Sequence, residues 1–149
     1  GEAFKKAIHE FTVKLHEDEA LIYKLLYRSR QVAMVDGALY LYTANQGGLM
    51  AKRFTPERMT MLDILDERLA FYRENGETGD LIRFTQNRQF MFAAEYYLHT
   101  ADNKPFRRKA RKKQWALYWP LMRSSYWLRR KLVYTYAMLL PGHFKKLYF

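Results

Sequence analysis

The sequence predicts a mainly α-helical protein with one short β-hairpin. Two observations lead to this fold class: apolar residues recur at helical spacing through several segments, and Asp36-Gly37 separates two β-branched and aromatic runs. A third observation sets the size. Of the 149 residues, 49% are hydrophobic and 17% aromatic, which is enough for one domain with a core and argues against disorder.

The first half of the chain is expected to hold two helices, the hairpin and a loop. A short helix is expected over residues 3–10. A second helix is expected over 17–30, because good helix formers continue there without Gly or Pro. The run "RQVAMVDGALYLYT" follows, and its Asp-Gly pair favours positive φ at both centres of a type I′ hairpin turn. "TANQGGLMAKRF" is then expected to be a loop.

The second half is expected to be helical in several pieces. Thr55 is a good N-cap and Pro56 suits the first helical position, so a helix begins there and ends at Asn75-Gly76. Its apolar positions recur at helical spacing: Met59, Leu62, Leu65, Leu69 and Tyr72. A long helix covers 79–100 and ends at "ADNKP". The remaining tail is expected to break at Pro120 and Pro141.

Charge divides the chain sharply at residue 103. Residues 1–103 hold 13 basic and all 15 acidic side chains, whereas residues 104–149 hold 13 basic and no acidic ones. The net charge of +11 therefore comes entirely from the last part. This asymmetry predicts a body, 1–103, and a basic aromatic helical tail, 104–149, that binds a partner.

Several functional classes are disfavoured by what the sequence lacks. There is no cysteine, hence neither a disulfide framework nor a thiolate metal site, and His9, His99 and His143 are isolated and show no metal-ligand spacing. "GEAFKKAIHEF" lacks the apolar core of a signal peptide, and no apolar run reaches the length of a membrane span. We therefore expect a cytoplasmic location.

The charged stretch "KLHEDEALIYKLL", residues 14–26, has a simple structural interpretation. Carboxylates in a first helical turn meet the positive end of the helix dipole and its unpaired N–H groups. Asp18 would then be a cap, Glu19 a dipole partner and His16 an ordinary surface histidine.

The order of segments around this stretch resembles family 2 glycosyltransferases. "KLHEDE", the amphipathic helix "ALIYKLLYRSRQ", the Asp-Gly hairpin "VAMVDGALYLYT" and "GGLM" follow one another as in the half after the nucleotide-binding part of these enzymes, and "AFKKAIHEF" resembles the segment upstream. The resemblance covers about residues 3–75. It implies the C-terminal portion of an α/β GT-A fold, with residues 1–103 on the acceptor side of the catalytic domain.

The resemblance also implies an activity, the inverting transfer of a sugar from a nucleotide-diphospho-sugar to a glycan or lipid-linked acceptor. The implied base that takes the proton of the acceptor hydroxyl is Asp18, and Glu17 supports it or contacts the acceptor. Glu19 is expected on the helix flank. Weaker candidates for acceptor and loop contacts are His16, Asn45, Gly47 and Gly48.

The chain departs from the family in ways that limit these expectations. No parallel βαβ series and no acidic D-x-D motif precede the matched part, so the chain is expected to be a fragment that is inactive alone. The divalent metal of the full-length enzyme, Mg²⁺ or Mn²⁺, would be bound mainly by the missing half, with no metal site in this chain. Many members also have Arg-x-Arg-x-Gly-Ser where residues 43–48 read "TANQGG".

The basic aromatic tail leaves three interpretations open. Its aromatics pack on the body with its cations in water, or it binds nucleic acid, or it lies on a membrane surface where Trp and Tyr prefer the headgroups and cations attract anionic lipid. No known nucleic-acid module is recognisable, whereas a lipid-linked acceptor favours the inner membrane face. The candidates for membrane or anion contacts are Arg107, Arg108, Lys109, Arg111, Lys112, Lys113, Trp115 and Trp119. The competing function is a non-enzymatic basic helical module that binds anionic membrane or nucleic acid.

Overall fold

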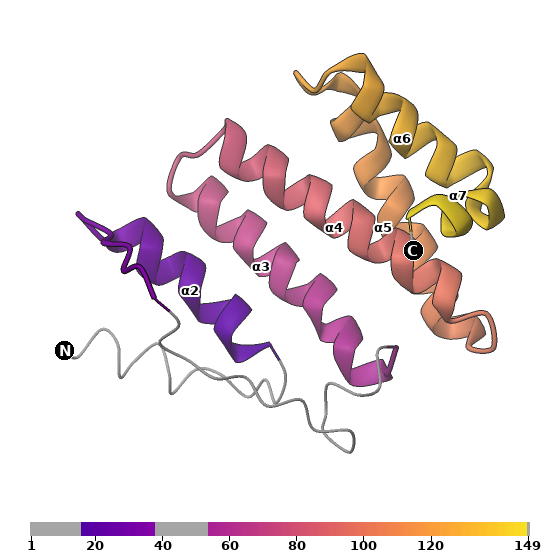
Figure 1. The fold of residues 1–149 in the computed structure, drawn as a ribbon, viewed down its shortest axis with the longest axis horizontal. Coiled ribbons are helices and arrows are strands. Elements are labelled where there is room, and N and C mark those ends of the chain that lie inside the picture. Colours follow the sequence, from indigo (N-terminus) through magenta and orange to yellow (C-terminus); the bar gives the residue numbers. More distant parts are fainter. Residues whose placement is uncertain (1–15, 38–53, 149) are drawn as a thin grey trace.

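The computed structural model describes residues 16–37 and 54–148, and in these residues all regular structure is helical (Figure 1). In chain order the elements are α2 (Glu17–Arg28), the 3₁₀ helix η1 (Pro56–Met59), α3 (Thr60–Glu74), α4 (Asp80–His99), α5 (Lys104–Arg123), α6 (Leu128–Leu139) and α7 (Pro141–Tyr148). Helices α2, α3 and α4 lie side by side, α5 packs along α4 with side chains that also reach α3, and α6 and α7 lie at the end of the molecule away from α2.

The expected fold class, mainly α with one β-hairpin as part of an α/β GT-A fold, is wrong. The described residues contain no strand, and the first arm of the predicted hairpin, residues 31–37, is irregular and exposed. An isolated strand gains no ladder hydrogen bonds, and this segment has no partner strand among the residues that are described. The predicted type I′ turn is not formed either, because Gly37 has φ +136° but Asp36, its other central residue, does not have a positive φ. The second arm lies outside the described residues, as does the helix expected over 3–10.

The helices predicted on either side of this segment are confirmed. α2 begins at the expected residue and ends two residues early, and α4 covers almost the whole of 79–100. The helix opened by Thr55-Pro56 starts with one 3₁₀ turn, η1, before continuing as α3. Its five predicted apolar positions are all buried: Met59, Leu62, Leu65, Leu69 and Tyr72.

The turn between α3 and α4 follows the glycine chemistry of helix ends. Gly76 has φ +80°, its N–H donates to the carbonyl of Arg73 at 3.0 Å, and the N–H of Glu77 donates to the carbonyl of Tyr72 at 2.9 Å. This pair of bonds is a Schellman motif, in which a residue with positive φ closes the last turn. The predicted stop at Asn75-Gly76 is therefore confirmed, and α4 can turn back beside α3.

The tail is helical in pieces, with one break displaced from its predicted place. The Asn103 side chain accepts the N–H of Phe106 at 3.2 Å and so caps α5. Pro120 lies inside the last turn of α5, and the helix continues to Arg123 before it breaks. Pro141 opens α7 as its first residue, where a missing N–H costs nothing.

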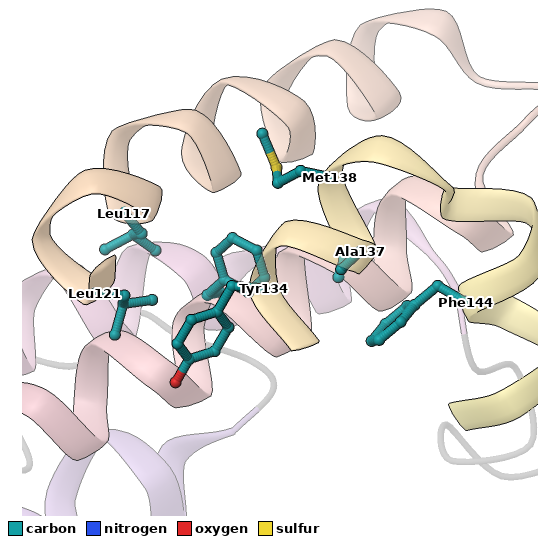
Figure 2. Packing of buried hydrophobic residues seen from close by; sticks show 8 residues of the cluster. Leu117, Leu121, Tyr134, Ala137, Met138 and Phe144 are labelled. Carbon is teal, nitrogen blue, oxygen red and sulfur yellow. The ribbon is translucent and has the colours of Figure 1, made fainter. Parts of the chain in front are cut away.

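The helices of the tail share a core with α4 (Figure 2). Tyr134 of α6 is completely buried against Phe90 of α4, and its hydroxyl donates to Oδ1 of Asn87 at 2.7 Å. The buried members of this cluster are Phe90, Ala94, Leu117, Leu121, Tyr134, Ala137, Met138 and Phe144. This packing agrees with the interpretation in which part of the aromatic tail packs on the body. The division of the chain at residue 103 stays a prediction.

Hydrogen bonds of a buried glutamine hold α4 to α3. The fully buried Gln89 of α4 donates to the carbonyl of Leu62 at 3.0 Å and to Oδ1 of Asp66 at 2.8 Å. Both acceptors of this buried NH₂ group lie on α3, so the two bonds hold the helices in one register.

Candidate functional site

A groove of about 650 Å³ lies where α2 meets α3 and α4, and we call it the α2 groove. Its lining combines charged residues with aromatic and aliphatic ones: Asp18, Glu19, Ile22, Tyr23, Leu26, Tyr27, Arg68, Tyr72, Leu81 and Arg88. Six of the ten come from α2, so the position of this helix determines the shape of the groove. An apolar pocket with a few converging polar groups is the usual form of a small-molecule site.

Aromatic side chains dock α2 on α3. The ring of Tyr23 is buried and packs edge-on against Phe71 and Tyr72, with ring centroids 5.5 and 5.8 Å apart. One turn later, Tyr27 packs against the same two rings, and its hydroxyl donates to Oε1 of Glu77 at 3.0 Å. The spacing of four residues between Tyr23 and Tyr27 therefore places both rings on the inner face of α2.

Glu19 links α2 to both neighbouring helices through two arginines. Nη2 of Arg68 donates to Oε2 of Glu19 at 2.9 Å and to the Glu19 carbonyl at 2.7 Å. Arg88 of α4 donates to the other carboxylate oxygen, Oε1. The guanidinium of Arg68 also lies 4.7 Å from the ring centre of Tyr23. Because the Arg68 side chain is only 11% exposed, its charge is offset mainly by this carboxylate.

Asp18 differs from Glu19 in having an exposed side chain. The only hydrogen bond of its carboxylate within the described residues is the one that Oδ1 accepts from the Glu19 N–H at 2.8 Å. Asp18 is the second residue of α2, so the prediction that it caps the helix is wrong. The N-cap position is occupied by His16. That residue makes no capping bond with its side chain. The Asp18 carboxylate is thus oriented by backbone and available to a ligand in the groove.

His16 adopts a backbone conformation that is rare for a residue with a side chain. Its φ of 67° and ψ of 28° lie in the left-handed region, which costs roughly 1–2 kcal/mol for a non-glycine residue. Its carbonyl accepts the N–H of Ala20 at 3.0 Å, so the strained residue begins α2 directly. Glu17 is the first residue of α2. Strain of this kind concentrates at functional sites.

The tyrosines of the groove stay protonated over the physiological range. Burial and, secondarily, the nearby carboxylate of Glu67 raise the pKa of Tyr23 well above its ordinary value. Burial also raises the pKa of Tyr72. These hydroxyls are neutral hydrogen-bonding groups, so the anionic groups of the groove are its carboxylates.

The remaining candidates of the acceptor loop, Asn45, Gly47 and Gly48, lie outside the described residues. Of the predicted membrane or anion contacts on α5, two make ion pairs with α3. Nζ of Lys109 is 3.1 Å from Oδ2 of Asp63, and Lys113 pairs with Asp66.

Two of the α5 arginines bind neighbouring groups within the fold. Arg107 donates to the hydroxyl of Tyr97 at 3.1 Å. Arg111 donates to the carbonyl of Met138 at 2.7 Å, near the end of α6.

The other predicted contacts on α5 face outward. Arg108 and Lys112 are exposed and make no interaction with the described residues, and Trp115 and Trp119 are about half exposed. These four positions follow one helical stripe, because they are separated by four, three and four residues. They are therefore the members of the predicted set that can meet a partner directly.

Arg68 and Arg88 are the site residues that sequence reasoning missed. They lie 49 and 69 residues from Glu19, beyond any local spacing. The only hint was the Glu-Asp-Glu cluster itself, because so many neighbouring carboxylates call for cationic partners.

Neither a metal cluster nor a membrane span is found in 16–37 and 54–148. No group of three or more His, Asp or Glu residues there could hold a metal ion. Within the same residues, no helix combines the length and apolar character needed to cross a bilayer. No protein-family model, no curated protein and no solved structure matches the chain.

Proposed function

We propose that the chain is the acceptor-side part of an inverting family 2 glycosyltransferase, with the α2 groove as the acceptor site. The observation that carries the proposal is the pair Asp18 and Glu19 at the start of α2. One carboxylate is exposed at the groove, and the next is held by Arg68 and Arg88. The sequence resemblance around "KLHEDE" assigns the catalytic role to the exposed member, Asp18.

The proposed step is a single displacement at the anomeric carbon of the donor sugar. The acceptor hydroxyl oxygen forms a bond to this carbon while the bond to the diphosphate oxygen breaks. The hydroxyl proton passes to the Asp18 carboxylate, and the nucleoside diphosphate leaves with the electron pair of the broken bond. Because attack and departure occur on opposite faces, the anomeric configuration is inverted.

The chain would contribute positioning as well as the base. The ion pairs of Glu19 with Arg68 and Arg88 hold the first turn of α2 against α3 and α4, and this keeps the neighbouring Asp18 backbone in place. The rings of Tyr23 and Tyr27 and the side chains of Ile22 and Leu26 line the groove and offer apolar surface to a sugar or lipid-linked acceptor. The donor and its divalent metal, Mg²⁺ or Mn²⁺, would be held mainly by residues outside this chain. The described residues do not fit a metal site, so no step is assigned to the ion.

The function is tested with the enzyme that contains this chain. It is incubated with a panel of nucleotide-diphospho-sugars and a membrane or glycan fraction as acceptor, and release of nucleoside diphosphate is followed. We expect release that depends on the acceptor, and proton NMR of the fresh product should show an inverted anomeric centre. Retention of configuration, or no release from any donor of the panel, would contradict the proposal.

A second measurement concerns the 149-residue chain by itself. Because the donor is assigned to residues outside it, calorimetry with uridine or guanosine diphospho-sugars and Mg²⁺ or Mn²⁺ should show no saturable binding. Micromolar binding would place the donor site in this chain and contradict the division of roles.

A further inference from the structure

Helix α6 carries apolar side chains on two opposite faces. Tyr134, Ala137 and Met138 face the core, yet Leu128, Leu132 and Leu139 are 72%, 59% and 72% exposed. We call these three exposed residues the outer leucine face. They are separated by four and seven residues, which places them within about 40° of one another around the helix. A helix with one buried face normally turns polar residues to water on the other.

Further exposed apolar residues lie at both ends of α6 and on α7. Trp127, directly before the helix, is 87% exposed. Leu140, directly after it, is 50% exposed, and Leu147 of α7 is 71% exposed. Single exposed apolar residues are ordinary, but a cluster on one helix and its flanks marks an interaction surface.

A hydrogen bond connects this surface to the exposed aromatics of α5. The hydroxyls of Tyr118 and Thr135 lie 3.1 Å apart, and Thr135 stands between Leu132 and Leu139 in the sequence. The ring of Tyr118 packs edge-on against Trp115 and Trp119, with ring centroids 6.0 and 5.3 Å apart. The half-exposed tryptophans of α5 therefore border the outer leucine face.

The charged side chains of α6 and α7 are all positive. Arg129, Arg130 and Lys131 open α6, and Lys145 and Lys146 lie on α7. None of these five pairs with a carboxylate within the described residues, unlike the lysines of α5 that face α3. No Asp or Glu occurs from residue 103 to the end of the chain, so α5, α6 and α7 supply no carboxylate of their own.

We propose that the outer leucine face, with its flanking cations, docks on an anionic lipid bilayer. Leucine side chains would enter the boundary between headgroups and acyl chains, Trp127 would lie among the headgroups, and the cations would meet lipid phosphates. A second copy of the chain fits poorly, because pairing two such faces would bring like charges together. Nucleic acid would satisfy the cations but leave the leucines in water. The proposal places the apolar contact with the bilayer on α6, beside the basic run of α5. It does not depend on whether the chain transfers sugars.

The proposal is tested by cosedimentation of the full chain with vesicles. One set is pure phosphatidylcholine, and the other contains about 30% phosphatidylglycerol as anionic lipid. We expect strong binding to the anionic set, weak binding to the neutral set, and partial release by salt. Replacing Leu132→Gln and Leu139→Gln together should reduce partitioning into anionic vesicles at least about tenfold, because their apolar area no longer enters the lipid.

Two matched variants separate apolar contact from general effects. Val32 and Val35 are 63% and 68% exposed, so Val32→Gln with Val35→Gln changes comparable exposed side chains far along the sequence from α6 and should bind like the wild type. Arg129→Gln with Lys146→Gln should remove part of the salt-sensitive binding only. Circular dichroism must show wild-type helicity for every variant.

Four results would overturn the proposal. The first is that the leucine variant binds vesicles as well as the wild type does. The second is that neutral vesicles bind as much protein as anionic ones at low salt. Sedimentation would show a dimer that the leucine variant converts to monomers, which would identify a second copy as the occupant. Duplex RNA or DNA would bind more tightly than anionic vesicles and prevent their binding.

Discussion

Asp18 and Glu19 are neighbouring carboxylates whose different surroundings suit different tasks. Glu19 is 24% exposed and meets two guanidinium groups, whereas Asp18 is exposed and accepts one backbone N–H. A carboxylate held by two arginines is suited to be an anchor, because both of its oxygens are bound to neighbouring helices. The carboxylate free to meet a ligand is the one suited to act as a base.

If Glu19 is the anchor of α2, Glu19→Gln should destabilise the fold by about 1–3 kcal/mol, because the Arg68 guanidinium would keep its charge with only a neutral acceptor. Urea denaturation measures the change. Asp63→Asn is the matched control, since its ion pair with Lys109 is exposed at both ends and should contribute less than about 1 kcal/mol. Equal effects of the two substitutions would show that Glu19 is no special anchor.

At the scale of elements, the sequence predicted helices well wherever the signal was local. Gly76 supplies the positive φ of the turn between α3 and α4, and a Cβ there would meet nothing within 4 Å. Gly76→Ala should therefore cost about 1–2 kcal/mol through backbone strain alone. Gly142→Ala, in α7 and equally open, should be neutral or slightly stabilising. Thermal unfolding compares the two, and a Gly76→Ala protein as stable as the wild type would contradict the assigned turn.

The hairpin was predicted wrongly and the arginines of the α2 groove were not predicted at all, because both depend on residues distant in the sequence. Val32 and Val35 have strand propensity, but a strand forms only beside another strand, and the local sequence does not decide whether a partner strand is present. The predicted role of Asp18 came from a motif, whereas the arginines that hold Glu19 come from α3 and α4. Side-chain spacing within one helix could not have revealed either arginine.

At the scale of the whole molecule, buried tyrosines make the fold sensitive to alkali. Burial raises the pKa of Tyr23 and Tyr134 above the value of about 10 that they have in an unfolded chain. Above that pH the unfolded state has lost these protons and the folded state still holds them, so stability falls as pH rises. The slope is about 1.4 kcal/mol per pH unit for each such tyrosine.

Urea denaturation at several pH values above about 9, with phenolate absorbance as a second signal, measures this effect. The Tyr134→Phe variant should lose stability less steeply with pH than the wild type, although it is less stable near neutral pH without its bond to Asn87. Parallel pH curves for the two proteins would contradict the assigned burial of this hydroxyl.

The transfer rate of Asp18→Asn, measured in the enzyme that contains this chain, tests the central claim most directly. With saturating donor and acceptor, we expect turnover to fall about a hundredfold or more, as for loss of a general base, while donor binding survives. Asp102→Asn removes an exposed carboxylate in the turn before α5 and should leave turnover unchanged. Near-wild-type turnover in Asp18→Asn, or equal losses in both variants, would contradict the assignment of Asp18 as the base.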